Sequence, residues 1–77
     1  MTLGKKIKCL RRELGMTQLE LAKTSKLSQG YISLIEKEVY IPKESTLIAL
    51  SVALGISSKE LLNFENSRII KIAETAD

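Results

Sequence analysis

The 77-residue sequence predicts an all-α domain of five short helices. Apolar residues recur at the three- and four-residue spacing of a helix face, and no stretch alternates apolar and polar residues as a half-buried strand would. Glycines follow two of these stretches, and two others begin with the S/T-x-x-E pattern that caps helices. A chain of this length has one small hydrophobic core, so tight helix packing or dimer formation has to add stability.

The first helix is predicted to carry Leu3, Ile7, Leu10 and Leu14 on one face, at positions i, i+4, i+7 and i+11. Gly15 follows this stripe, and a residue without Cβ can take the positive φ that ends many helices. We therefore expect this helix to stop at the glycine.

Two short helices are predicted next, each opened by a capping residue. Thr17-Gln18-Leu19-Glu20 is a capping box, in which the hydroxyl and the carboxylate each accept from the other residue's amide. The helical pattern breaks at residues 24–27, and Ser28 caps the following helix. The residues expected in the core from these two helices are Leu21, Ala22, Ile32 and Ile35. Short helices this close cannot lie antiparallel, and they favour a sharply crossed helix-turn-helix over a bundle hairpin.

Residues 37–42 are predicted to be an extended connection that ends at Pro42, since proline disfavours helical geometry in the preceding residue. A fourth helix then runs from Lys43 or Glu44 to Leu54, and Gly55 ends it. The stripe of this helix is Leu47, Leu50 and Leu54.

A second capping box, Ser57-Ser58-Lys59-Glu60, begins a short fifth helix with Leu61 and Leu62. We divide the chain into a domain at residues 1–64, with its helix-turn-helix at about residues 17–36, and a tail at residues 65–77. The tail fits either a sixth helix or a frayed end. Its apolar residues at helical spacing are Ile69, Ile72, Ala73 and Ala76.

The residue inventory argues against an enzyme. The chain has no histidine, so a His-based metal site and Ser-His or Cys-His pairs are excluded, and it has no glycine-rich phosphate loop. Cys9 has no partner for an internal disulfide and is expected to be a small side chain on a helix rather than a reactive thiol. We expect no metal, no cofactor and no small-molecule ligand.

The chain also lacks membrane and export features. Its apolar runs are far shorter than the roughly 20 residues that span a bilayer, and its N-terminus has no apolar signal segment. A cytoplasmic protein is therefore expected. Residues 1–37 carry eight Lys or Arg and three Glu, a net charge of +5, whereas residues 38–77 carry a net charge of −2. The basic half is the one suited to a polyanion.

An ordered set of short motifs resembles the Xre/Cro family, the lambda-repressor-like DNA-binding domains. The resemblance covers about residues 3–62. In its small size, the chain resembles phage Cro-like repressors, restriction–modification controller proteins and some antitoxins. The matching segments are Gly4-Lys5-Lys6-Ile7-Lys8, Leu10-Arg11, Gly15-Met16-Thr17-Gln18, Leu21-Ala22, Ser28 to Glu36, Pro42, Leu47 and Leu54-Gly55-Ile56.

The resemblance implies that the third helix enters the DNA major groove. The base-contacting positions it implies are Ser28, Gln29, Gly30 and Ser33. Gln29 is the best candidate for direct readout, since its amide can bond adenine N6 and N7 together. Gly30 costs about 1 kcal/mol in a helix relative to alanine, so it either lets the helix lie close to the bases or meets a local structural need.

The resemblance also implies contacts to the DNA backbone. The phosphate-contacting positions are Gln18, Tyr31, Lys37 and Lys43. For each of them, the alternative is a surface or packing residue without a role in DNA binding. The family arrangement further places Arg11 beside Glu36, in an ion pair that would orient the third helix.

Three departures from the family pattern leave details open. Glu38 stands where the family usually has glycine, so the turn after the third helix is expected to differ. Residues Val39 to Ile41 make the next connection unusually apolar, and they either pack under the domain or belong to a partner surface. Leu19 occupies a position that is generally polar or charged in the family.

One helix covers too few base pairs for useful specificity, and family members generally bind as twofold dimers. We expect a homodimer interface in the region of the fourth and fifth helices, formed by Val52, Ile56, Phe64, Ile69 and Ile72, with local packing of the tail as the alternative. The predicted function is a sequence-specific regulator of transcription, a repressor by the simpler interpretation, that binds a palindromic operator in double-stranded DNA. The alternative is a protein-interaction module, such as an antitoxin, with the same fold.

Overall fold

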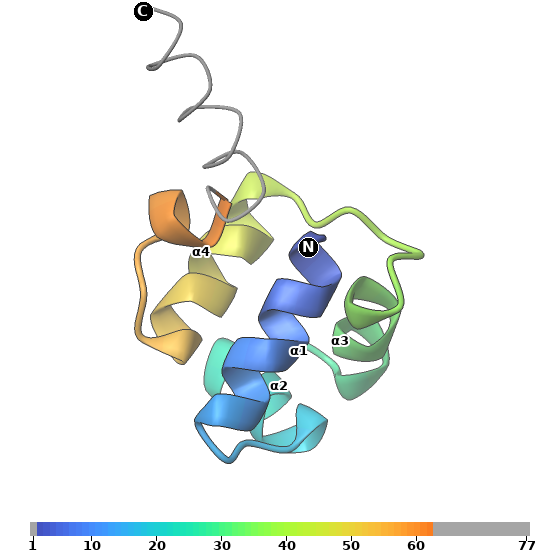
Figure 1. Ribbon diagram of the computed structural model, residues 1–77. Helices are drawn as coiled ribbons and strands as arrows, with labels where there is room; N and C mark the ends of the chain where they lie inside the picture. Colours follow the sequence, from blue (N-terminus) through green and yellow to red (C-terminus); the bar gives the residue numbers. More distant parts are fainter. Residues whose placement is uncertain (1, 63–77) are drawn as a thin grey trace, which may run out of the picture.

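The computed structural model describes residues 2–62, and these residues form an all-α domain, as the sequence predicts. Four helices, α1 (Leu3–Glu13), α2 (Gln18–Ser25), α3 (Gln29–Glu36) and α4 (Glu44–Leu54), are followed by helical residues 58–62, where a fifth helix begins (Figure 1). Of the helix-to-helix contacts, those of α2 with α3 and α4 and those of α1 with α3 are the most extensive. Phe64 and the predicted tail at residues 65–77 lie outside the described residues.

The first helix ends one residue before the predicted stripe does. Its last residue is Glu13, and Leu14 is the C-cap with a side chain that is 54% exposed. The prediction that Leu14 continues the buried stripe is therefore wrong, because the chain leaves the helix there. Gly15 follows with a φ of +70°, which confirms its role as the stop.

The predicted caps of α2 and α3 are confirmed. The Glu20 amide donates to the Thr17 hydroxyl at 3.1 Å, and the Thr17 amide donates to the Glu20 carboxylate at 2.9 Å. The Tyr31 amide donates to the Ser28 hydroxyl at 3.1 Å. Between the helices, Lys26 takes the left-handed conformation with a φ of +61°, so only three residues make the turn from α2 into α3.

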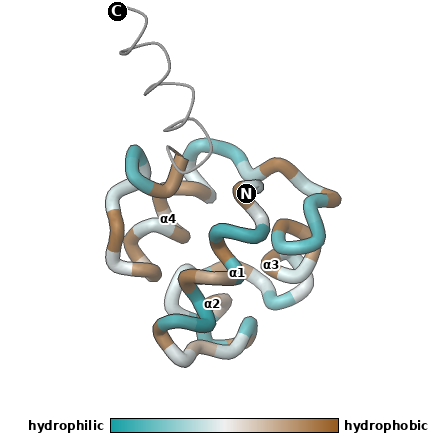
Figure 2. The backbone as a smooth tube through the Cα atoms, viewed as in Figure 1, coloured by the Kyte–Doolittle hydropathy of each residue, from teal (hydrophilic) through white to brown (hydrophobic). Residues whose placement is uncertain are grey.

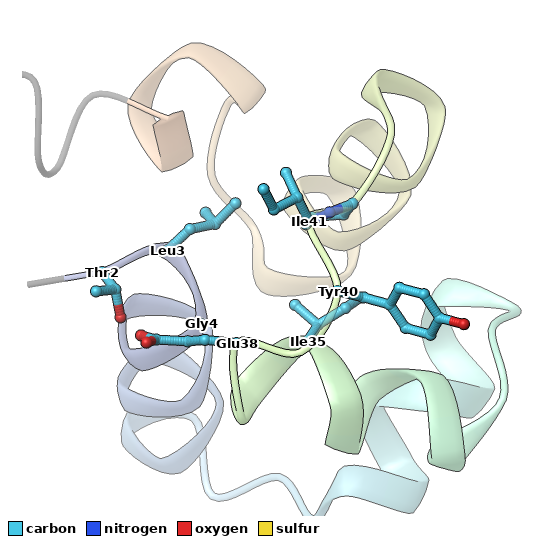
Figure 3. Close-up of a pocket in the computed structure, with 8 residues that line it drawn as sticks. Thr2, Leu3, Gly4, Ile35, Glu38, Tyr40 and Ile41 are labelled. Carbon is cyan, nitrogen blue, oxygen red and sulfur yellow. The ribbon is translucent and has the colours of Figure 1, made fainter.

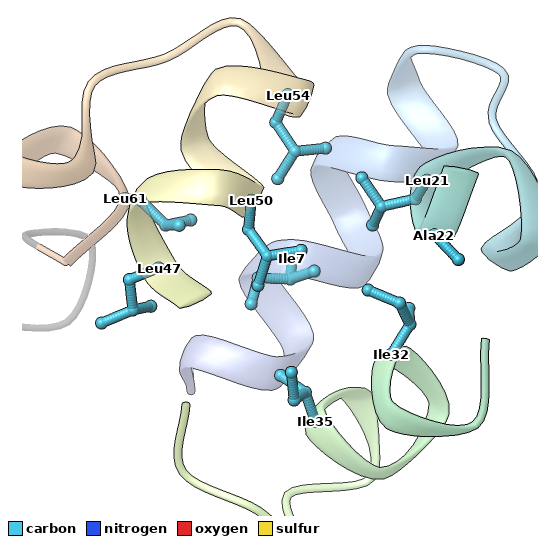
Figure 4. Close-up of a cluster of buried hydrophobic side chains, with 9 residues drawn as sticks. All are labelled: Ile7, Leu21, Ala22, Ile32, Ile35, Leu47, Leu50, Leu54 and Leu61. Carbon is cyan, nitrogen blue, oxygen red and sulfur yellow. The ribbon is translucent and has the colours of Figure 1, made fainter. Parts of the chain in front are cut away.

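The core lies where the helices meet, and it contains the residues predicted from the stripes of α2, α3 and α4 (Figure 4). Ile7 from α1, Ile32 from α3 and Leu50 from α4 are fully buried. Complete burial of such side chains contributes roughly 1.5–3 kcal/mol each. The remaining core residues are Leu21, Ala22, Ile35, Leu47, Leu54 and Leu61. Leu62, by contrast, is 40% exposed.

The connection from α3 to α4 differs from its prediction where it begins. Lys37 is helical in its dihedral angles, and Glu38 takes a φ of +66°, so an extended chain begins only after this turn. The expectation that glutamate would change the turn is also wrong, because the positive φ is present without glycine. Val39 and Ile41 are 65% and 90% exposed, which excludes packing under the domain. Figure 2 shows apolar stretches of the chain along this connection.

A close approach of α1 to the end of α3 fixes the position of this turn. A Cβ on Gly4 would collide with the carbonyl oxygen of Ile35 and lie 3.0 Å from Cγ of Glu38. Glycine is therefore required at this place by packing alone. Within residues 2–62, helices of the length and apolarity needed to cross a bilayer are absent.

Candidate nucleic-acid interface

The start of α3 presents an uncharged polar surface. Ser28, Gln29 and Gly30 are exposed, and Ser33 is half-buried one turn further on. Because Ser28 accepts a hydrogen bond as the helix cap, its hydroxyl retains a donor for an outside partner. The buried side chains of Ile32 and Ile35 hold the helix against the core, and the exposed residues at its start lie away from the core.

Gly30 has no packing reason to be glycine within residues 2–62. A Cβ built on it would meet no atom within 4 Å, and its φ is not among the positive values. Within these residues, the structure therefore does not support the alternative that a local structural need explains Gly30. An incoming surface that has to approach the helix backbone closely would explain the residue.

Tyr31 lies on the same helix and contacts an aromatic ring from the connection. The ring centroids of Tyr31 and Tyr40 are 5.7 Å apart, with an interplanar angle of 72°, in the edge-to-face arrangement that aromatic pairs favour. Tyr40 is 53% exposed. In the sequence, Tyr40 stands out only as part of an apolar connection, and no pattern pairs it with Tyr31.

The two lysines predicted to contact phosphates are both exposed, at opposite ends of this connection. Lys37 is the C-cap of α3, and Lys43 is the N-cap of α4 without a side-chain cap hydrogen bond. Both ammonium groups are therefore accessible to an anion. Their position on either side of Tyr40 makes the connection a mixed basic and aromatic segment.

Arg11 and Glu36 form the ion pair that the family resemblance implies. Nε and Nη2 of Arg11 donate to the two carboxylate oxygens of Glu36 at 2.8 and 3.1 Å, and Nη1 donates to the Met16 carbonyl at 2.8 Å. The side chains are 9% and 3% exposed. This pair therefore joins α1 and the turn before α2 to the end of α3.

Gln18, the first residue of α2, is half-buried and also contacts this pair. Its Nε2 donates to Oε1 of Glu36 at 3.1 Å. The family resemblance implies a phosphate contact for Gln18, but its bond to Glu36 was not predicted, because the two residues are distant in the chain. At the same helix end, hydrogen bonds from the Thr17 amide and hydroxyl hold the pKa of the exposed Glu20 carboxyl below its ordinary value of 4.5.

The residues predicted at a dimer interface are only partly described. Val52 is 75% exposed on α4, and Ile56 is half-buried after it. Both line a shallow hollow together with Gly55, Ser57, Lys59 and Glu60. Phe64, Ile69 and Ile72 lie outside the described residues. Ile48, at 47% exposed, adds to the apolar surface of α4.

A second hollow lies between the start of α1 and the connection, with a volume of about 380 Å³ (Figure 3). Leu3, Ile35 and Ile41 contribute apolar surface to it, whereas the ring of Tyr40 points away from it. Among residues 2–62, no cluster of histidine, cysteine or acidic side chains is arranged to hold a metal ion.

Comparisons with known proteins agree with this geometry. Residues 4–67 match the family described as "Helix-turn-helix domain". The immunity repressor protein of Bacillus phage phi105 is 42% identical over 65 residues, which are 84% of this chain but 45% of the repressor. The chain thus spans less than half the length of this curated relative.

Solved structures of proteins with about one third sequence identity share the fold. The biofilm master regulator SinR, in a complex with DNA, has a TM-score of 0.75 and 32% identity over 79% of this chain and 98% of its own. The P22 c2 repressor, in a complex with a synthetic operator, has a TM-score of 0.75 and 33% identity over 79% of this chain and 92% of its own. The chain therefore belongs to the helix-turn-helix family of DNA-binding transcriptional regulators, in its Xre/Cro, lambda-repressor-like branch.

Proposed function

We propose that this chain regulates transcription by binding a specific palindromic operator in double-stranded DNA, with α3 in the major groove. The observation that carries the proposal is the exposed, uncharged start of α3 on a helix whose other face is buried. Bound structures of SinR and the P22 c2 repressor, which share this fold, contain DNA. In bacteria and their phages such a regulator acts in the cytoplasm, where the DNA is.

The contacts divide into two kinds. Gln29, with Ser28, Gly30 and Ser33, would face the bases, because amides and hydroxyls can read base edges. Lys37 and Lys43 would meet phosphates, as would Tyr31 and Gln18, and these contacts position the protein without carrying sequence information.

The test begins with selection of bound sequences from random duplex DNA. On the selected operator, Gln29→Ala is expected to weaken binding by about 1–3 kcal/mol, because recognition of one base pair is lost. Binding to random DNA should remain unchanged. Lys43→Ala is the matched contrast, and it should weaken all sequences alike and flatten the dependence of affinity on salt. Selection of no sequence above background would contradict the proposal. An equal loss on both DNAs for Gln29→Ala would remove this residue from base readout.

We also propose that the protein is a homodimer through the outer face of α4. The exposed apolar side chains of Val52 and Ile48, four residues apart on α4, support this surface, since contiguous apolar patches mark protein interfaces. Sedimentation at tens of micromolar should show a dimer, and Val52→Asp should give a monomer. The selected operators should then contain two half-sites about one helical turn apart. Sedimentation of the unmodified chain as a monomer would refute the dimer without affecting the assignment of α3.

A second candidate function, a protein-interaction module, is favoured by one observation. The ridge of Val39, Tyr40 and Ile41 is exposed beside the hollow under the connection. Apolar association at this ridge would persist at high salt, whereas binding to phosphates weakens steeply. A partner that is retained at high salt and lost with Ile41→Asp would support this second function.

A further inference from the structure

One buried carboxylate is shared between a structural ion pair and the side chain of Gln18. Among residues 2–62, Oε2 of Glu36 accepts only from Arg11, at 2.8 Å, whereas Oε1 accepts from both Arg11 and Gln18 at 3.1 Å. The arginine already supplies an opposite charge and two hydrogen bonds. The neutral amide of Gln18 therefore adds little to the charge balance, and its bond needs another explanation.

The bond restricts the side chain of Gln18 without consuming all of its donors. An amide group carries two N–H donors, and the bond to Glu36 occupies one of them. Within residues 2–62, no hydrogen bond is formed by the second donor. A free glutamine samples many rotamers, and a contact that has to order it loses affinity. A Gln18 already held by Glu36 has lost most of this freedom before any partner arrives.

The location of Glu36 ties this restraint of Gln18 to α3. Glu36 is the last residue of α3, and the same Arg11 that pairs with it also bonds the Met16 carbonyl, next to the cap of α2. The amide of Gln18 is thus fixed relative to α3, the helix that carries the base-reading side chains. A displacement of either helix end would move the amide donor.

We propose that Glu36 is a positioning residue for DNA binding, which holds the Gln18 amide so that its second N–H is ready for a phosphate. The inference rests on the proposed function and adds to it a mechanism. Contact with a phosphate at α2 and the placement of α3 are coupled through one carboxylate.

The test is a double-mutant cycle on DNA affinity. Gln18→Ala should weaken operator binding by about tenfold, as expected for loss of a hydrogen bond to a charged group. In a Glu36→Leu background, which has no acceptor for the Gln18 amide, the same substitution should cost less than about threefold, because the amide is no longer held. Glu38→Leu is the matched control background, since it makes the same change at a nearby exposed glutamate. There, the tenfold loss should remain.

The unmodified protein allows a second measurement, which does not depend on the folding of the Glu36 variant. In NMR spectra without DNA, one side-chain amide proton of Gln18 should exchange with water more slowly than either proton of the exposed Gln29, the only other glutamine of the chain. Equal exchange at the two glutamines, or an undiminished tenfold loss in the Glu36→Leu background, would overturn the inference. If the unmodified chain binds no duplex DNA, the proposed function fails instead, and the two failures are distinguishable.

Discussion

The two ends of α3 differ in what holds them. At the N-terminal end, Ser28, Gln29 and Gly30 are exposed, and the Ser28 cap is a local hydrogen bond. At the C-terminal end, Ile35 and Glu36 are buried, and residues from α1 and α2 contact them. The difference shows a helix fixed at one end by tertiary contacts and free at the other to meet a partner. Substitutions at the fixed end should therefore affect stability, and those at the free end should affect binding.

The largest effect is expected from Arg11→Met. The substitution leaves the Glu36 carboxylate buried without its cation, which typically costs 3–5 kcal/mol. Denaturant unfolding followed by circular dichroism would measure the loss.

Two variants control this experiment. Arg12→Met makes the same change at an exposed neighbour and should be nearly neutral. A double variant, Arg11→Met with Glu36→Leu, should recover most of the stability, because it leaves no buried charge unpaired. A loss for Arg11→Met of less than about 1 kcal/mol would contradict the view that this pair fixes the end of α3.

A smaller loss of stability, about 1–3 kcal/mol, is expected from Gly4→Ala. The added methyl group would collide with the Ile35 carbonyl oxygen, so α1 and the end of α3 have to separate. Thermal unfolding would detect it as a lower melting temperature.

Gly30→Ala is the matched control, at the free end of α3. Its methyl group meets open space, and alanine in a helix gains up to about 1 kcal/mol over glycine. This variant should be more stable, and its affinity for DNA should fall if the helix backbone lies close to the bases. Equal melting temperatures for the two variants would remove the contrast between the ends of α3.

The smallest effect is expected from Ser28→Ala, at about 1 kcal/mol. The substitution removes the acceptor for the Tyr31 amide but leaves the contacts of Ile35 and Glu36 in place. Ser45→Ala, within the first turn of α4 and exposed, is the control and should change stability little. A loss for Ser28→Ala as large as that for Arg11→Met would show that the two ends are equally important to the fold.

Much of the fold was predictable because its determinants are local. The Thr17 capping box, the Ser28 cap and the stop at Gly55 each depend on residues within a few positions of one another, and all are present in the structure. The inward faces of α3 and α4 follow from helical spacing alone. Leu14 shows the limit of this reasoning, since the periodicity continues one residue beyond the helix.

The site was predictable in its residue types but not in its connections. The sequence by itself determined an all-α chain, its capped helix-turn-helix and the uncharged side chains at the start of α3. Only the tertiary structure decided that Gln18 bonds Glu36, that Tyr40 contacts Tyr31 and that Glu38 accepts a positive φ. The physical reason is that caps and stripes are set by neighbours in the chain, whereas these contacts are set by which helix ends packing brings together.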